Sequence, residues 1–251
     1  MKRLVRSFVT AFKTLTVLPL GGGSAGAFAD SLYWFPVTGF FIGAALYVPG
    51  RLIYAWGPLA WPEGPALLIV LISVLITGGL HLDGLSDWAD GFWGGRNAQR
   101  SLAIMKDSAV GTFGAAALVF IILAKWICLT RLLDYGRLHW IIIACVLSRS
   151  VQVPAASFFP YARPEGGTGK AFIDGAGRRH AFAALLAGLI LALAVSRGEW
   201  IPAACTAAGA VVFTLLFCAW SLRKIGGVTG DILGAVSEIT ETGVLFAAVF
   251  M

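Results

Sequence analysis

The chain has 251 residues, of which 58% are hydrophobic and only 13% are charged, and its mean hydropathy is +0.83. A soluble domain carries about 25% charged residues. A soluble fold could not bury this much apolar surface, so the lipid bilayer must solvate most of it. The net charge of +6 is therefore an orientation signal at the membrane rather than a sign of nucleic-acid binding. We expect one integral membrane domain over residues 1–251.

The N-terminal segment carries apolar and basic side chains at helical spacing. Leu4, Phe8 and Phe12 recur every four residues, and basic residues lie between them. This pattern predicts an amphipathic interfacial helix over residues 1–20, lying on the membrane surface. A cleaved signal peptide is the alternative, although Lys13 interrupts its apolar stretch.

Seven segments approach the length and apolarity of a membrane span, for which about 20 residues are needed. They are residues 32–54, 65–82, 110–130, 139–158, 181–196, 200–221 and 232–251. The predicted fold class is therefore all-α: a polytopic membrane helical bundle with about seven transmembrane helices plus the N-terminal interfacial helix.

The basic residues favour one orientation of this bundle. With a cytoplasmic N-terminus, four basic residues lie outside, namely Arg51, Arg131, Arg137 and Arg197. Thirteen lie inside: Lys2, Arg3, Arg6, Lys13, Arg96, Arg100, Lys106, Arg163, Lys170, Arg178, Arg179, Arg223 and Lys224. The positive-inside rule supports this arrangement. It places the connecting loops 83–109, 159–180 and 222–231 together on the cytoplasmic side.

Three aspartates follow the second predicted span, in the stretch HLDGLSDWADG. Asp83, Asp87 and Asp90 have i, i+4 and i+7 spacing, which places them within roughly 60° of one helix face. A divalent cation would remove the repulsion between their charges, and Mg²⁺ combines carboxylate ligands with substrate phosphates. We therefore predict that these three aspartates bind Mg²⁺. A solvated acidic loop at 83–109 without a metal is the alternative.

Further candidate residues lie in the predicted cytoplasmic loops and in the fourth span. One of the three aspartates, Asp107 or His81 is the candidate general base, although an interfacial role would also explain a histidine at this position. An arginine inside a span is a functional hypothesis by default. The candidate phosphate-binding cations are Arg96, Lys106, Arg149 and Arg163.

The last predicted span carries acids on one helix face. Asp231 and Glu238 are seven residues apart, and Glu241 is close to the same stripe. Carboxylates in a span need water, a cation or another partner. We expect Asp231 and Glu238 to turn toward the same site as the aspartates after span two. Alternatively, Asp231 serves only to cap its helix.

Taken together, five motifs resemble the cobalamin synthase family, also called the adenosylcobinamide-GDP ribazoletransferases. They are GGLHLDGLSDWADGFWGGR, MKDSAVGTFG, LSRS, YARPEGGTG and GGVTGDILGAVSEITE. The resemblance implies a Mg²⁺-dependent membrane enzyme of a bacterial cytoplasmic membrane, whose active site faces the cytoplasm. Its substrates would be adenosylcobinamide-GDP and α-ribazole or α-ribazole 5′-phosphate. Its products would be adenosylcobalamin, or its 5′-phosphate, and GMP.

Two other classes of protein share some of these features. DWADGFWGGR is similar to the acidic signature of CDP-alcohol phosphotransferases, but the GxxxDxxxD half of that signature is not evident. A membrane transporter would place ionisable groups near the midplane of the bilayer. The residues that could lie there are Lys125, Arg149, Glu238 and Glu241. The clustering of the acids at one end of the spans argues against a transporter.

Overall fold

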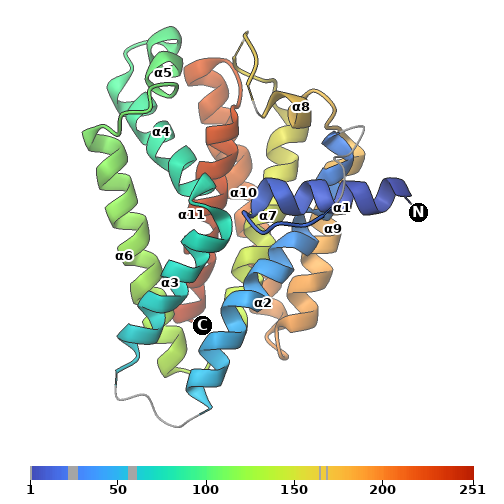
Figure 1. Ribbon diagram of the computed structural model, residues 1–251, viewed down its shortest axis with the longest axis vertical. Helices are drawn as coiled ribbons and strands as arrows, with labels where there is room; N and C mark the ends of the chain where they lie inside the picture. The colour runs from blue at the N-terminus through green and yellow to red at the C-terminus, as the bar shows by residue number, and fades with distance from the viewer. Residues whose placement is uncertain (1, 22–27, 56–60, 164, 168) are drawn as a thin grey trace.

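The computed structural model describes residues 2–21, 28–55, 61–163, 165–167 and 169–251, and no strand occurs in these ranges. Met1, and Pro164 and Thr168 of the glycine-rich loop, lie outside the described residues. The helices form one bundle (Figure 1), which confirms the predicted all-α fold class. They are α1 (Lys2–Leu15), η1 (Phe28–Trp34), α2 (Phe35–Tyr54), α3 (Glu63–Thr77), α4 (Leu80–Gly94), α5 (Ala98–Ile104), α6 (Thr112–Asp134), α7 (His139–Phe158), α8 (Lys170–Ile173), α9 (Arg178–Val195), α10 (Trp200–Ile225) and α11 (Gly230–Val249).

Helix α7 is the central element of the bundle. It packs against α2, α9, α10 and α11. Of its most apolar 18-residue stretch, 89% is buried inside the protein. By contrast, only 22% of the most apolar 18-residue stretch of α6 is buried. Helices that are apolar on all sides need either protein or lipid around them. The outer helices therefore present apolar side chains to the bilayer, while α7 forms the protein core.

Six described helices, or helix pairs with a continuous axis, are long and apolar enough to span a membrane. They are Phe28–Tyr54, Thr112–Asp134, His139–Phe158, Arg178–Val195, Trp200–Ile225 and Gly230–Val249. The second predicted span, 65–82, is not a continuous helix. It is divided between α3 and α4, whose axes differ by 90°.

Two glycines produce this break. Gly78 and Gly79 have φ values of 61° and 70°, in the left-handed region that glycine adopts without a steric penalty. Helix α3 has 15 residues and so extends for only about 22 Å at 1.5 Å per residue. Because this is shorter than the ~30 Å hydrocarbon core, α3 and α4 together lead the chain from one end of the bundle to the other.

Helix α1 lies across the long axis of the bundle (Figure 1). Phe8 contacts Trp34 and Phe41 through edge-to-face ring pairs, while Leu4 and Val5 are exposed. The segment is thus helical and amphipathic. Some of its apolar side chains pack on the protein, and others are exposed and free to contact lipid. Its placement on the membrane surface stays a prediction.

The three predicted cytoplasmic segments meet at one end of the bundle, where α5 and α8 lie (Figure 1). Lys106 Nζ donates a hydrogen bond to Glu165 at 2.8 Å, and Lys224 Nζ donates to the Gly95 carbonyl at 2.8 Å. The segment 83–109 differs from the expected loop, because α4 and α5 make up most of it. It is therefore a mostly helical part of the bundle end and not an irregular connection.

At the opposite end, Glu199 joins two connections of the bundle. Its carboxylate accepts hydrogen bonds from Arg137 at 2.5 Å and from Trp140 Nε1 at 2.6 Å. Partial burial alone would raise the pKa of Glu199, but these hydrogen bonds and the Arg137 charge outweigh it and lower the pKa below its ordinary value. The α6–α7 and α9–α10 connections are held together there.

Candidate active site

The aspartates of α4 fall into two groups in the structure. Asp83 is exposed and Asp87 is half-buried, and neither side chain forms an ion pair or hydrogen bond with a described residue. Asp87 lies within electrostatic reach of Asp83, Asp90, Asp231 and Arg163. The predicted face of α4 thus exists, and two of its three carboxylates are available to a ligand.

The third aspartate, Asp90, stabilises the start of α6. Its side chain is buried and accepts hydrogen bonds from the backbone N–H groups of Gly111 at 2.7 Å and Gly114 at 2.8 Å. The first N–H groups of a helix have no partner within the helix, and a carboxylate there also interacts favourably with the helix dipole. Asp90 therefore has a structural role that its sequence spacing did not reveal.

Close packing of α4 against α11 positions Asp231 beside the α4 face. A Cβ atom on Gly84 would lie 2.9 Å from the Asp231 carbonyl oxygen, and one on Gly234 would lie 3.3 Å from His81 Cα. Larger side chains at either glycine would push the two helices apart. These glycines therefore bring the N-terminus of α11 to the acidic end of α4.

Asp231 pairs with Arg163 and is not the cap of α11. The N-cap is Thr229, whose side chain accepts a hydrogen bond from the Ile232 N–H at 3.3 Å. Arg163 donates to Asp231 Oδ2 at 2.5 Å and to the Met105 carbonyl at 3.2 Å. The alternative in which Asp231 only caps its helix is therefore wrong, and the site joins α4, α5, α11 and the loop that carries Arg163.

A short backbone pairing holds that loop in place. The Ala162 N–H donates to the Val228 carbonyl at 2.9 Å, and the Val228 N–H donates to the Pro160 carbonyl at 2.8 Å. Gly227 allows this approach, since a Cβ on it would lie 3.0 Å from the Pro160 carbonyl carbon. The amino-acid sequence alone does not predict that these two segments, which are distant along the chain, pair with each other.

The remaining predicted loop residues surround the acids less closely. Lys106 is exposed and paired with Glu165; such exposed pairs contribute little stability and can exchange for another anion. Asp107 is exposed and accepts a hydrogen bond from the Ala109 N–H at 3.0 Å. Arg96 is exposed and has no described partner. Neither Arg96 nor Asp107 contacts the α4 aspartates in the described part of the chain, so their roles stay predictions.

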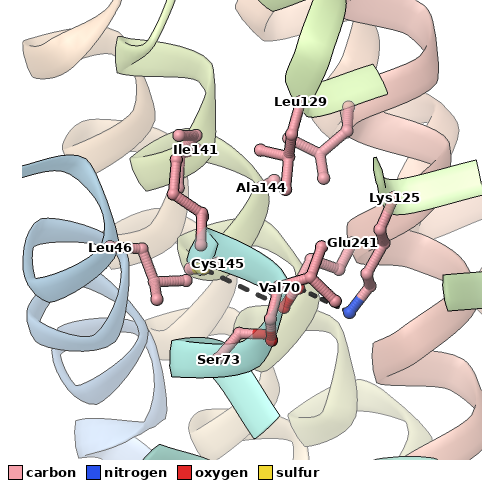
Figure 2. Close-up of a pocket in the computed structure, with 11 residues that line it drawn as sticks. Leu46, Val70, Ser73, Lys125, Leu129, Ile141, Ala144, Cys145 and Glu241 are labelled. Atoms are coloured by element: carbon pink, nitrogen blue, oxygen red, sulfur yellow. Dashed lines mark hydrogen bonds and ion pairs between the residues drawn. The ribbon is translucent and has the colours of Figure 1, made fainter. Parts of the chain in front are cut away.

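Arg149 and Glu238 belong to a buried charge network inside the bundle. Lys125 Nζ of α6 donates to Glu238 at 2.6 Å and to Glu241 at 2.7 Å on α11. Arg149 of α7 donates to Glu241 and, at 2.7 Å, to Ser148 Oγ. Figure 2 shows Lys125 and Glu241 pointing toward each other beside a small cavity. The network contains two cations and two carboxylates, so its formal charges cancel.

This network differs from the expected arrangement of two of its members. From the sequence, Arg149 is expected to bind substrate phosphate and Glu238 to join the aspartate site. In the structure both are paired with other members of the network. The missed residue is Lys125. A lysine inside an apolar span, together with two glutamates in another span, was the available signal for an interhelical pair.

His81 is also buried and lies on a different face of α4 from the aspartates. Its Nε2 is 3.0 Å from Gln152 Nε2, and its Nδ1 has no described partner. The contact joins α4 to the central helix α7. A direct proton transfer would require His81 to reach the exposed face where Asp83 lies, and the described contacts direct it elsewhere.

The donor set of the α4 face fits a cation that is held jointly by protein and substrate. Among the described residues, no group of three or more His, Cys, Asp and Glu side chains is arranged to hold an ion. The structure therefore lacks the predicted three-aspartate cluster in ready-formed geometry. Asp83 and Asp87 remain as oxygen ligands, and one or two carboxylates plus substrate phosphates is the usual protein environment of Mg²⁺.

Comparison with known proteins identifies the family. Residues 7–249 match the family model described as cobalamin-5-phosphate synthase. The chain is 45% identical over 247 residues to adenosylcobinamide-GDP ribazoletransferase from Chlorobium phaeobacteroides strain BS1, covering 98% of both chains.

It is 46% identical over 246 residues to the protein of the same name from Chlorobaculum parvum, covering 98% of this chain and 95% of the relative. For the protein of this name from Syntrophobacter fumaroxidans, the identity is 38% over 223 residues, covering 89% of this chain and 88% of the relative. No solved structure matches the chain at a significant level. The resemblance found in the sequence motifs is thus confirmed, and the chain belongs to the cobalamin-5-phosphate synthase family.

Proposed function

We propose that this protein is an adenosylcobinamide-GDP ribazoletransferase that joins adenosylcobinamide-GDP to α-ribazole or its 5′-phosphate. The relatives that carry this name are aligned over nearly the whole chain. The products are adenosylcobalamin, or its 5′-phosphate, and GMP. This reaction assembles the nucleotide loop of vitamin B12.

The observation that carries the assignment is the free acidic face of α4 beside the Asp231–Arg163 pair. In the proposed step, the α-ribazole hydroxyl oxygen attacks the phosphorus bonded to the corrinoid linker. The bond from this phosphorus to the oxygen of GMP breaks. The hydroxyl proton passes to a carboxylate of the α4 face, which can act as a general base once it is positioned within hydrogen-bonding distance. Atoms and charge balance, because GMP leaves with the bonding electron pair.

Basic groups around this face are suited to the diphosphate. Lys106 can leave its exposed pair with Glu165 for a phosphate oxygen, and Arg163 retains an Nε that has no described partner. Guanidinium and ammonium groups form strong charge-assisted hydrogen bonds with phosphate. Arg163 would therefore position the leaving group while its other donors hold Asp231.

Mg²⁺ is the cofactor we propose, held by Asp83 and Asp87 together with substrate phosphate oxygens. When bound, it would neutralise the phosphate charges and orient the reacting oxygens. Asp90 would support this site by fixing the start of α6 near the carboxylates. The proposed ligand set is thus smaller than the set of three expected from spacing.

We place the site on the cytoplasmic side of a bacterial inner membrane. The basic excess of the loops at this end of the bundle supports the orientation. A single cysteine at Ala98, in a background lacking the four native cysteines, should react only with reagents added to the cytoplasmic side. Labelling from the periplasm would contradict this orientation.

Product analysis tests the function directly. The purified protein in nanodiscs, given adenosylcobinamide-GDP, α-ribazole and Mg²⁺, should release GMP and form adenosylcobalamin in equal amounts. A parallel reaction with a CDP-alcohol should release no CMP. Release of CMP without GMP would assign the acidic face to CDP-alcohol phosphotransfer and would refute the proposal.

A further inference from the structure

A cavity of about 610 Å³ opens beside the acidic face of α4. It lies where the end of α1, the α3–α4 bend and the first turns of α6 meet. Asp83 and Ser86 line it from α4, and Leu118 and Ile122 line it from α6. Its volume is within the ~300–1,000 Å³ range of pockets that hold small organic ligands. The cavity and the proposed reaction site therefore share Asp83.

One buried hydroxyl in this cavity lacks a partner. Ser86 is 2% exposed, and its Oγ makes no hydrogen bond with any described residue. By contrast, the hydroxyls of Thr16 and Thr77 in the same lining donate to carbonyls of their own helices at 2.8 and 2.9 Å. A buried polar group without a partner is costly, and native proteins rarely retain one without a reason. Ser86 therefore points to a ligand with a polar atom at this depth.

The other residues that line the cavity favour an apolar, uncharged ligand. Leu82, Leu118 and Ile122 supply hydrocarbon walls, and no lysine or arginine is among the described lining residues. A diphosphate would find no cation here to replace its water. The corrinoid substrate is also too large, since it combines a corrin ring, an adenosyl group and GDP.

We propose that this cavity binds the acceptor nucleoside, with the flat apolar base of α-ribazole between α4 and α6 and its polar edge at Ser86. The inference rests on the proposed transferase function and deepens it. The ribose then extends toward Asp83, where its hydroxyl meets the phosphate of the corrinoid. The two substrates thus approach the α4 face from different sides: the nucleoside from the α1–α6 cavity and the GDP-corrinoid from the basic loops.

Two tryptophan variants on α6 provide a matched test. Leu118→Trp places a bulky ring in the cavity, whereas Val119→Trp places the same ring at the neighbouring exposed position outside the lining. The experiment measures the KM values of both substrates in nanodiscs and the equilibrium binding of α-ribazole alone. Leu118→Trp should raise the KM for α-ribazole about 10-fold or more, as an overfilled pocket does. The KM for adenosylcobinamide-GDP should stay within about two-fold, and Val119→Trp should resemble the wild type.

Ser86→Ala is the second variant, because it changes little in the free protein. If Ser86 bonds the nucleoside, its loss should raise the KM for α-ribazole about 2- to 10-fold, the usual effect of one hydrogen bond. An unchanged α-ribazole KM in both Leu118→Trp and Ser86→Ala would mean that the cavity holds lipid, and would overturn the inference. A rise in the corrinoid KM instead would assign the cavity to the other substrate and would also overturn it.

The binding measurement separates this inference from the proposed function. If the wild type binds α-ribazole and Leu118→Trp does not, the cavity assignment holds even if no GMP is released. If GMP is released but α-ribazole binding is insensitive to Leu118→Trp, the function holds and the cavity assignment fails.

Discussion

The buried pair of Lys125 and Glu238 gives the sharpest prediction about stability. Their side chains are only 7% and 5% exposed, and their charged atoms are 2.6 Å apart. Glu238 has no other charged partner among the described side chains, whereas Glu241 also accepts from Arg149. Replacing Lys125 with methionine therefore leaves Glu238 as an uncompensated charge inside the bundle.

The expected loss follows from this geometry. Removing one partner of a buried ion pair costs about 3–5 kcal/mol, because the other charge stays desolvated and unpaired. For a chain of this size, 1 kcal/mol corresponds to roughly 2–4 °C in melting temperature. Lys125→Met should thus melt about 6–20 °C below the wild type. The double variant Lys125→Met/Glu238→Gln leaves the balanced Arg149–Glu241 pair, so its loss should be about 1–3 kcal/mol smaller than the sum of the single losses.

Thermal and SDS unfolding of the purified protein in detergent would measure this double-mutant cycle. Arg131→Met on the same helix is the control: its ion pair with Asp134 is 3.9 Å long and 57% exposed on the arginine side. Its loss should be below about 1 kcal/mol. If the two single losses are simply additive, or if Lys125→Met is no worse than Arg131→Met, Lys125 and Glu238 do not interact and the network described for the bundle interior is incorrect.

Three further outcomes are expected. Excess EDTA should stop turnover and added Mg²⁺ should restore it, since the diphosphate needs a counter-charge at Asp83 and Asp87; full activity in EDTA would exclude the metal. Asp231→Ser should lower turnover roughly 10- to 100-fold, the effect of a hydrogen bond to a charged group; unchanged turnover would remove Asp231 from the site. Folded protein should still be obtained because Thr229 caps α11, although loss of the largely buried ion pair with Arg163 should lower the melting temperature. Glu199→Gln should lower the melting temperature at neutral pH. The difference in melting temperature from the wild type should shrink as the pH falls through the lowered pKa of Glu199, because the carboxylate then becomes protonated in both the folded and the unfolded state. A difference that does not change with pH would show that the charge of Glu199 is not the cause of the lost stability.

The bundle and its polar end were predictable because they follow from length, apolarity and the distribution of basic residues. The bend between α3 and α4 was not. Gly78 and Gly79 follow the apolar stretch directly, and glycines are common within continuous membrane helices. Only their left-handed backbone angles, which tertiary packing selects, distinguish a break from an uninterrupted span.

The candidate site was predictable as a set of residues but not as a set of contacts. Spacing correctly placed Asp83 and Asp87 on one face of a helix, because that depends on local geometry alone. Spacing could not reveal that Asp90 would meet the first N–H groups of α6, or that Arg149 would pair with Glu241. Each of these contacts joins helices that are distant in sequence, so helical periodicity contains no information about them.

Single-turnover release of GMP by Asp87→Asn tests most directly whether the unpaired carboxylates of α4, Asp83 and Asp87, perform the transfer. The substitution keeps the size of the side chain but removes its charge, and Asp134→Asn at the other end of the bundle is the control. GMP release by folded Asp87→Asn should fall at least about 100-fold, as expected for the loss of a group that takes part in the reaction, while Asp134→Asn should match the wild type. A rate for Asp87→Asn within a few-fold of the wild type would show that the carboxylates of α4 do not perform the transfer.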